Sequence, residues 1–246
     1  MSPRVATKNP AALSYYMMRR AVGIIALSLP LVLACGSIAL SLIGPRHELP
    51  HPLLQRSISD YYYTPMGDYL VGNLFAIAAF LVCTRGYDLS DEVTGYVSGI
   101  CAFGVALVPS PNPYAAYHSK LQVDLGFVHT GFAALMFLAL AYFCLVLFRR
   151  TSPEKRVTRR KRHRNRVYRV CGVVMIVCIT VIICLPFDGA ARLLAPIHPL
   201  FGCETLSLAA FGVAWLTKGE GILKDKVQNH NHTHKSINEQ LVTTIQ

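Results

Sequence analysis

Apolar residues of this chain gather into six segments that short polar stretches separate. The segments lie near residues 21–43, 66–84, 93–109, 126–148, 168–187 and 198–217. Each is long enough, or nearly so, to cross the ~30 Å hydrocarbon layer of a membrane as a helix. The pattern therefore predicts an all-α fold, a polytopic bundle of six transmembrane helices that occupies residues 21–217.

Composition supports the membrane prediction. Hydrophobic residues make up 53% of the chain and charged residues 15%, against about 25% charged residues in soluble domains. The sequence contains no phosphate-binding glycine loop, no nucleophile elbow and no strong metal motif. It therefore indicates an architecture more directly than a chemistry.

Positive charges predict how the six segments are oriented. Eleven Lys or Arg residues fall in the twenty-one positions from Arg149 to Arg169. If residues 1–20 are cytoplasmic, the inner connections and ends carry twenty Lys or Arg and the outer loops carry four. Because positive residues stay on the cytoplasmic side, we expect both termini there, together with the loop 149–167 and the tail 218–246. The expected location is the plasma membrane, as a multi-pass protein of a bacterial inner membrane.

The basic loop also predicts a partner. Its centre carries Arg159, Arg160, Lys161, Arg162 and Arg164. Such a run beside a membrane attracts anionic headgroups, with about 1 kcal/mol for each residue near the surface. Nucleic acid is not expected, because aromatic residues are nearly absent from the run. The tail with its alternating histidines offers little to bury, and we expect it to be disordered.

Small residues predict close helix packing. Gly95, Gly99, Ala102 and Ala106 share one face of the third segment, and the second segment carries a similar stripe that begins at Gly72. Such stripes let helix backbones approach in lipid. We expect contacts inside the bundle, and a face for a homo-oligomer is the alternative.

Polar residues near the outer ends of three segments predict a site. They are Ser59, Asp60, Asp68, Asn73, Asp124, His129, His198 and Glu204. Ionisable groups in hydrocarbon are costly and usually face a cavity or a partner. The pattern therefore predicts an outward-facing polar pocket between the second, fourth and sixth helices, covered by the loop 44–66.

Each candidate also has a structural interpretation. Glu204 and Ser207 form a polar stripe that could hydrogen-bond a neighbouring helix. His129 could be a buried histidine whose ring nitrogens form hydrogen bonds inside the bundle. Asp68 and His198 stand where helix caps occur. The sequence leaves both interpretations open.

Two stretches carry a resemblance to known proteins. The run Ser57–Thr64, Ser-Ile-Ser-Asp-Tyr-Tyr-Tyr-Thr, and the run Phe211–Gly219 that closes the last segment resemble a group of bacterial six-span membrane proteins of uncharacterised activity. More distantly, the step Ile58-Ser59-Asp60 is similar to the Frag, DRAM and Sfk family. That resemblance implies lipid handling.

A second resemblance implies another chemistry. Ser59, Asp68, His129 and His198 are similar to the Ser, Asp and His set of the ceramidase and progestin-receptor superfamily of zinc-dependent intramembrane hydrolases. The chain departs from that pattern, because Gly202 stands four residues after His198 where the superfamily has a second histidine. On this comparison zinc would be the cofactor, with His129, His198 and Glu204 as candidate ligands.

The leading hypothesis is therefore a lipid-binding or lipid-handling membrane protein. The first alternative is a metal-dependent hydrolase of lipid amides or esters with His129, Glu204 and Asp68 as catalytic candidates. The second is a small transporter, although only Pro30 breaks a segment at its middle. Metal ligands around one centre would favour the hydrolase, an apolar cleft beside the polar groups would favour lipid binding, and a path to the basic face would favour transport.

Overall fold

The computed structural model of the chain describes residues 10–43, 54–84, 88–150, 158–185, 197–219 and 222. Its helices are α1 (Pro10–Ile43), α2 (Gly67–Val82), α3 (Leu89–Leu107), α4 (Lys120–Leu145), α5 (Arg159–Cys184) and α7 (Pro199–Lys218). Two 3₁₀ turns, η1 (Ser59–Tyr63) and η2 (Leu147–Arg149), accompany them. No strand occurs in these ranges, so the predicted all-α fold is confirmed for them.

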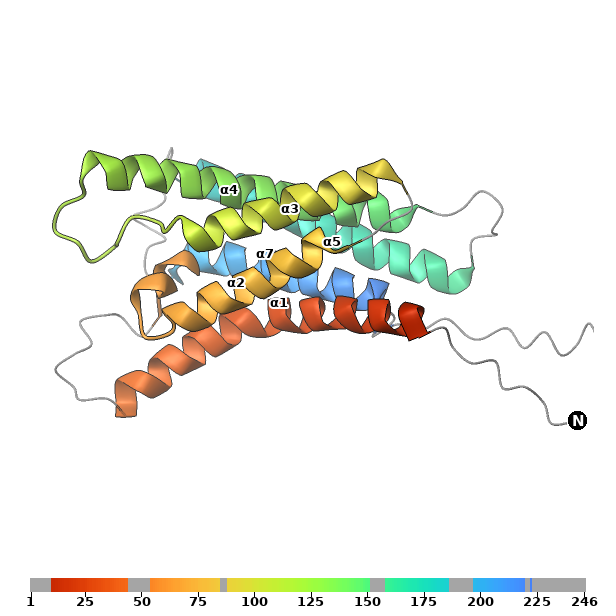
Figure 1. The fold of residues 1–246 in the computed structure, drawn as a ribbon, viewed down its shortest axis with the longest axis horizontal. Coiled ribbons are helices and arrows are strands. Elements are labelled where there is room, and N and C mark those ends of the chain that lie inside the picture. Colours follow the sequence, from red (N-terminus) through yellow and green to blue (C-terminus); the bar gives the residue numbers. More distant parts are fainter. Residues whose placement is uncertain are drawn as a thin grey trace, which may run out of the picture.

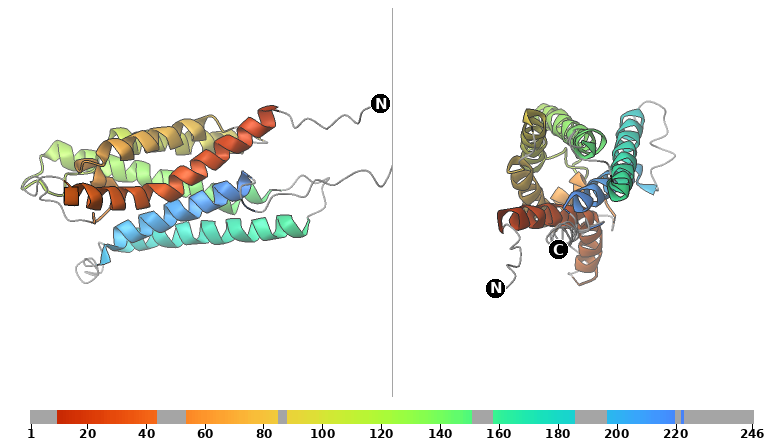
Figure 2. Two further views of the ribbon diagram at one scale, coloured as in Figure 1. Left: turned by 90° about the horizontal axis from the view of Figure 1, so that it is seen from below. Right: turned by 90° about the vertical axis from the view of Figure 1, so that its right-hand side faces the viewer.

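The helices form a ring in chain order. Each helix packs against the next, α7 closes the ring against α1, and α7 also contacts α4 (Figures 1 and 2). Successive helices run in opposite directions, so α1 begins and α7 ends at the same end of the bundle (Figure 1). We call this the basic end, because α5 begins there with Arg159, Arg160 and Lys161 and α7 ends there with Lys218. The opposite end holds η1 and is called the η1 end.

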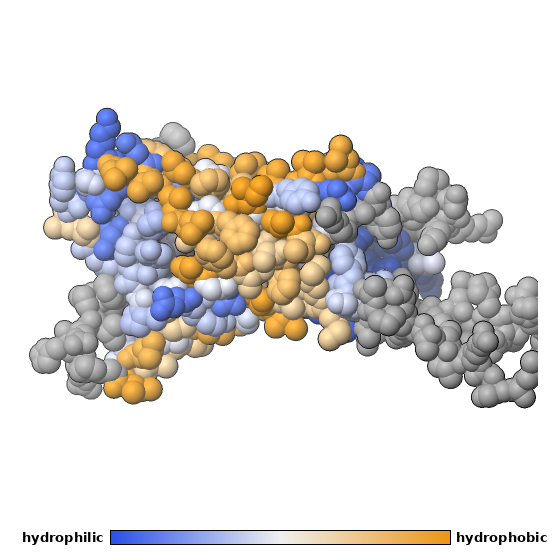
Figure 3. Space-filling view, in the orientation of Figure 1, coloured by the Kyte–Doolittle hydropathy of each residue, from blue (hydrophilic) through white to orange (hydrophobic). Residues whose placement is uncertain are grey.

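Four of the described helices are long and apolar enough to cross a membrane, over residues 14–43, 120–149, 159–184 and 199–218. Helix α2 is apolar but has 16 residues, a length of about 24 Å. Helix α3 has 19 residues and begins with two acids, Asp91 and Glu92, in its first turn. Hydrophobic residues cover the middle of the face in Figure 3, and hydrophilic residues gather toward its ends. The structure thus supports a membrane protein with several spanning helices.

Two helices begin earlier than the hydrophobic segments predicted. Helix α1 begins at Pro10, and α5 begins at Arg159, so the second half of the predicted basic loop is helical. The Thr158 hydroxyl accepts the Lys161 N–H at 3.1 Å and caps α5. Because Lys and Arg are good helix formers, the apolar pattern marks the buried length of α5 and not its start.

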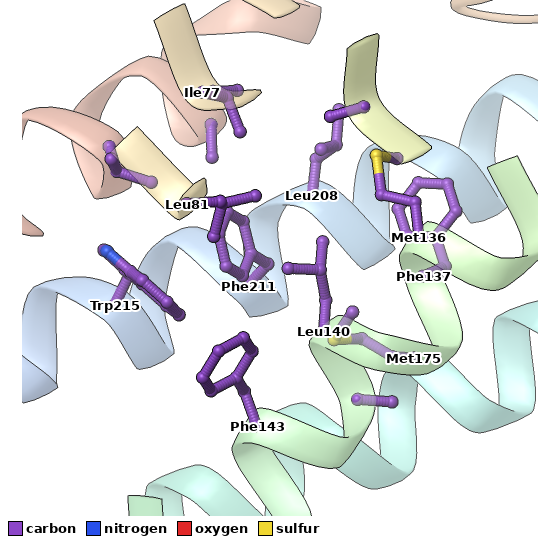
Figure 4. Packing of buried hydrophobic residues seen from close by; sticks show 14 of the residues in the cluster. Ile77, Leu81, Met136, Phe137, Leu140, Phe143, Met175, Leu208, Phe211 and Trp215 are labelled. Carbon is purple, nitrogen blue, oxygen red and sulfur yellow. The ribbon is translucent and has the colours of Figure 1, made fainter. Parts of the chain in front are cut away.

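Aromatic rings fill the interior toward the basic end. Trp215 of α7 is fully buried, and the centroids of the Phe143, Phe148 and Phe211 rings lie 5.3, 5.0 and 4.9 Å from the Trp215 ring. Figure 4 shows Phe211 between α4 and the Leu81 side chain of α2. The core therefore joins helices from both sides of the ring.

Glycines allow two close helix crossings. A methyl group at Gly212 would lie 2.8 Å from the Gly23 carbonyl oxygen, where α7 crosses α1. One at Gly99 would lie 2.8 Å from the Ala78 carbonyl oxygen, so the predicted stripe of α3 packs against α2. Gly72 has nothing within 4 Å, so the predicted stripe of α2 does not make such a contact there. Spacing along a helix defines a stripe but not the direction in which the stripe faces.

Candidate functional site

The segment 54–66 folds into the η1 end of the bundle. Tyr61 is 0% exposed, and its ring centroid lies 6.0 Å from that of Phe201 in α7. Ile58 and Ser57 are also buried. Because buried backbone groups need hydrogen-bond partners, a loop in this position depends on polar groups supplied by the surrounding helices.

Glu204 of α7 supplies the first of these groups. Its Oε2 accepts the Ile58 N–H at 2.6 Å, and its Oε1 accepts the Ser57 hydroxyl at 3.4 Å. One turn earlier, the Phe201 N–H donates to the Arg56 carbonyl oxygen at 2.9 Å. Glu204 therefore holds the segment on α7, whereas the structural interpretation of this residue was a bond to a neighbouring helix.

His129 of α4 supplies the second group. The residue is 7% exposed, its Nδ1 lies 2.5 Å from the Val108 carbonyl oxygen, and its Nε2 lies 3.0 Å from the Ser59 hydroxyl oxygen. A carbonyl oxygen only accepts, so in the neutral ring Nδ1 carries the proton and Nε2 accepts the Ser59 hydroxyl. The geometry places a basic nitrogen against a serine hydroxyl.

Asp60 is a buried acid of the segment itself. It is 6% exposed, and its Oδ2 lies 3.4 Å from Arg56 Nε. Burial raises the pKa of the Asp60 carboxyl, and the Arg56 charge opposes part of that rise.

A crevice opens beside Ser59 and His129, between η1, α2, α3 and α4. The enclosed space is about 10 Å³, the room that one water molecule needs, and about 240 Å³ of empty space is reached only when the part open to the surroundings is included. The lining residues are Ser59, Tyr62, Leu70, Val71, Leu74, Val105, Ala106, Pro109, Ser110 and His129. The α2 and α3 wall is apolar, whereas the η1 and α4 side carries the hydroxyls and the imidazole. The crevice is thus amphipathic.

The connection between α3 and α4 completes the rim of the crevice. The Tyr63 hydroxyl donates to the Ser110 carbonyl oxygen, and the Tyr114 hydroxyl donates to Gln55 Oε1. The Ser110 hydroxyl is buried and has no partner among the described residues. Only the prolines around Ser110 signalled an ordered turn in the sequence, so its place at the site was missed.

Four predicted site residues do not join this group. Asp68 and Asp124 are exposed, and the Asn73 amide donates to the Tyr69 carbonyl oxygen of its own helix at 2.7 Å. His198 precedes α7 with a left-handed φ of 47°, and its Nδ1 is buried without a partner in the described chain. The structure thus brings together Ser59, Asp60, His129 and Glu204 around one segment, although His129 and Glu204 contact different residues of it.

The candidate zinc ligands do not share a centre. Within the described ranges, no three His, Cys, Asp or Glu side chains lie together in a way that would hold a metal ion. His129 contacts Val108 and Ser59, whereas Glu204 contacts Ser57 and Ile58. The arrangement suits hydrogen bonding and proton exchange.

The predicted lipid-facing cations lie on the first turns of α5. Arg159 and Arg162 are exposed, and with His163 and Arg166 they line an open surface hollow of about 160 Å³. Lys161 instead donates to the carbonyl oxygens of Phe148 and Arg150, at 3.1 Å each. The outward cations therefore form a patch on one side of the helix.

Comparison of the chain with protein-family models, with curated proteins and with solved structures finds no match. The class of protein is consequently defined by the fold and the site alone. The described residues form a helical bundle with four helices that are long and apolar enough to cross a membrane, and with an amphipathic crevice at one end.

Proposed function

We propose that the protein spans the membrane six times and binds a lipid in the crevice at the η1 end. An apolar wall and a polar rim share one crevice, and this observation carries the proposal. An acyl chain would lie against Tyr62 and Val71, the more exposed apolar lining residues, and the polar atoms of the lipid would meet Ser59 and Ser110. Ligand sites combine apolar walls with few polar groups in this way.

The proposed orientation places the basic end in the cytoplasm and the η1 end outside. The outward cations of α5 would then lie at the headgroups of the inner leaflet, where Arg159, Arg162 and Arg166 attract anionic lipids. The crevice would take its lipid from the outer leaflet of the same membrane. A bacterial plasma membrane is the proposed location.

The other hypotheses have less support. A metal-dependent hydrolase needs ligands around one centre, but His129 and Glu204 engage different atoms of the segment 54–66. A transporter needs a path between the two ends, but aromatic rings around Trp215 fill the interior between α4 and α7 (Figure 4). Lipid binding requires neither feature.

Native mass spectrometry of the full chain tests the proposal, with phosphatidylglycerol and phosphatidylethanolamine as the added lipids. Val71→Trp places a larger side chain in the crevice, and Val128→Trp makes the same change at an exposed position of α4. We expect Val71→Trp to weaken lipid retention at least about tenfold, equivalent to about 1.4 kcal/mol of binding free energy. Val128→Trp should retain lipid as the original chain does. Equal retention by both variants would overturn the proposal.

A further inference from the structure

Ser59 has the surroundings of a serine that reacts. Its hydroxyl oxygen lies 3.0 Å from His129 Nε2, and His129 Nδ1 is held 2.5 Å from the Val108 carbonyl oxygen. Serine nucleophiles need a base within about 2.6–3.2 Å and a third group that orients the base. Ser59, His129 and Val108 fulfil these three roles from η1, α4 and the end of α3.

The backbone around Ser59 is fixed on both sides. Its own N–H donates to the Ser57 hydroxyl oxygen at 3.0 Å, and Glu204 holds the N–H of Ile58. Toward the C-terminus, η1 continues into the fully buried Tyr61. The side chain nevertheless lines the crevice and is only half-buried, so its backbone is held while its hydroxyl stays at the crevice wall.

A hydrogen-bond donor lacks a partner in the same crevice. The Ser110 hydroxyl is buried, has no partner among the described residues, and lines the crevice with Ser59 and His129. A buried hydroxyl without a partner costs free energy, so a ligand acceptor at this position is favoured. A carbonyl oxygen that gains negative charge is such an acceptor.

We infer that Ser59 is a nucleophile that takes an acyl group from a lipid ester bound in the crevice, with His129 as its general base and Ser110 as a donor to the ester carbonyl. The inference rests on the proposed lipid binding and names the reaction of that site. It requires no metal ligand set.

The reaction balances with water as the second substrate. Ser59 Oγ attacks the ester carbonyl carbon, and its proton moves to His129 Nε2. The bond from that carbon to the alkoxy oxygen breaks, and the leaving oxygen takes the proton from His129, which releases an alcohol. Water then attacks the acyl-Ser59 ester, gives one proton to His129, and yields a carboxylic acid and free Ser59 when that proton returns to Oγ.

The group that orients the base sets the expected speed. The Val108 carbonyl is neutral, so it stabilises the charged imidazole less than a carboxylate would. We therefore expect slow turnover of ordinary lipid esters and faster reaction with activated probes. Transfer of the acyl group to Ser59 should be detectable even where turnover is slow.

The test treats the full chain in detergent micelles with an alkyl fluorophosphonate, and separately with p-nitrophenyl butyrate, and peptide mass spectrometry locates the adduct. We expect the adduct on Ser59, none in Ser59→Ala, and a rate at least about a hundredfold lower in His129→Gln, the scale of general-base catalysis. The matched control is Ser41→Ala, because the Ser41 hydroxyl bonds only the Ile38 carbonyl oxygen of its own helix in the described structure.

Thermal unfolding of every variant checks that the variant is folded. If His129→Gln does not fold, Ser110→Ala still decides the matter, because it should slow the release of p-nitrophenol while the adduct stays on Ser59. An adduct at another residue, no adduct, or equal rates in the folded His129→Gln chain and the original would overturn the inference.

Lipid retention separates the two proposals. A chain that retains lipid in the crevice but leaves Ser59 unlabelled refutes acyl transfer alone, whereas retention insensitive to Val71→Trp refutes lipid binding.

Discussion

Glu204 lies in an apolar helix, and both of its carboxylate oxygens accept hydrogen bonds from the segment 54–66. The segment enters the bundle without a long regular helix of its own, so its donors need acceptors from elsewhere. Replacing an acceptor of a buried N–H leaves that group unsatisfied, which costs more than the hydrogen bond contributed. Glu204 therefore sets how firmly Ser59 is held.

We predict that Glu204→Ala lowers the free energy of unfolding by about 1–3 kcal/mol, because the Ile58 N–H loses its acceptor. Glu204→Gln keeps one carbonyl oxygen and should lose less. Asp124→Ala, at an exposed acid of α4, is the control and should stay within about 0.5 kcal/mol. Equilibrium unfolding in detergent measures the loss, and hydrogen exchange at Ile58 locates it. Equal stability of the Glu204→Ala and Asp124→Ala chains would contradict this role.

Asp60 predicts a pH dependence. Burial raises the pKa of its carboxyl, so the folded chain binds this proton more tightly than the unfolded chain. The stabilisation from the protonated Asp60 carboxyl is complete below the pKa of this group in the unfolded chain. It is lost as the pH rises through the pKa of this group in the folded chain. Asp60→Asn does not titrate, so its melting temperature minus that of the original chain should increase with pH across this window. A melting-temperature difference that stays constant from pH 3 to pH 8 would show that burial does not raise the pKa of Asp60.

Three of the four residues that meet at the segment were identifiable because they are ionisable groups in or beside apolar segments. Two of their partners were not, since Val108 and Ile58 contribute backbone atoms that any residue has. Asp124 was selected by the same rule and is exposed. Hydropathy gives the depth of a residue along a helix, but packing decides the face on which it lies.

Helix α7 has the central place among the elements. It packs against α1 and α5, contacts α4, and carries both Glu204 and Trp215. At the crossing with α1, Gly23 and Gly212 lie backbone against backbone, with added methyl groups 2.9 and 2.8 Å from the opposite carbonyl oxygens. Small residues at such positions let helices associate closely in lipid.

We predict that Gly212→Ala destabilises the bundle by about 1–3 kcal/mol, because the added methyl group forces α1 and α7 apart. The matched control is Gly72→Ala in α2, where nothing lies within 4 Å of the added methyl group. That variant should be neutral or more stable by up to about 1 kcal/mol, since Ala favours the helix over Gly. Thermal unfolding of both variants in one detergent compares them. Equal melting temperatures would show that the crossing is looser than the structure has it.

At the scale of the whole molecule, the ring places all the site residues at one end and the basic patch of α5 at the other (Figures 1 and 2). In the part of the chain that the structure describes, six α-helices coincide with the six apolar segments and follow in the predicted order. The alternation of apolar and polar stretches predicted less well where α1 and α5 begin, because helices continue into polar surroundings. It also did not predict that the segment 54–66 packs inside the bundle, since contacts with Glu204 and His129 join positions far apart in the sequence.

The distribution of charge predicts that the crevice faces outside. Green fluorescent protein becomes fluorescent in the cytoplasm, so its fusion after Gln246 should fluoresce. Alkaline phosphatase becomes active only outside the cytoplasm, so its fusion after Tyr117 should be active. Exchange of Arg159, Arg160 and Arg162 for Glu removes cations from the inner side and should lower both signals, because the positive-inside effect depends on Lys and Arg close to the spans. No Lys or Arg follows Arg169 in α5, so all positive charge of this helix lies in its first half. If alkaline phosphatase fused after Gln246 were active instead, the bundle would have the opposite orientation. The lipid for Ser59 would then come from the inner leaflet.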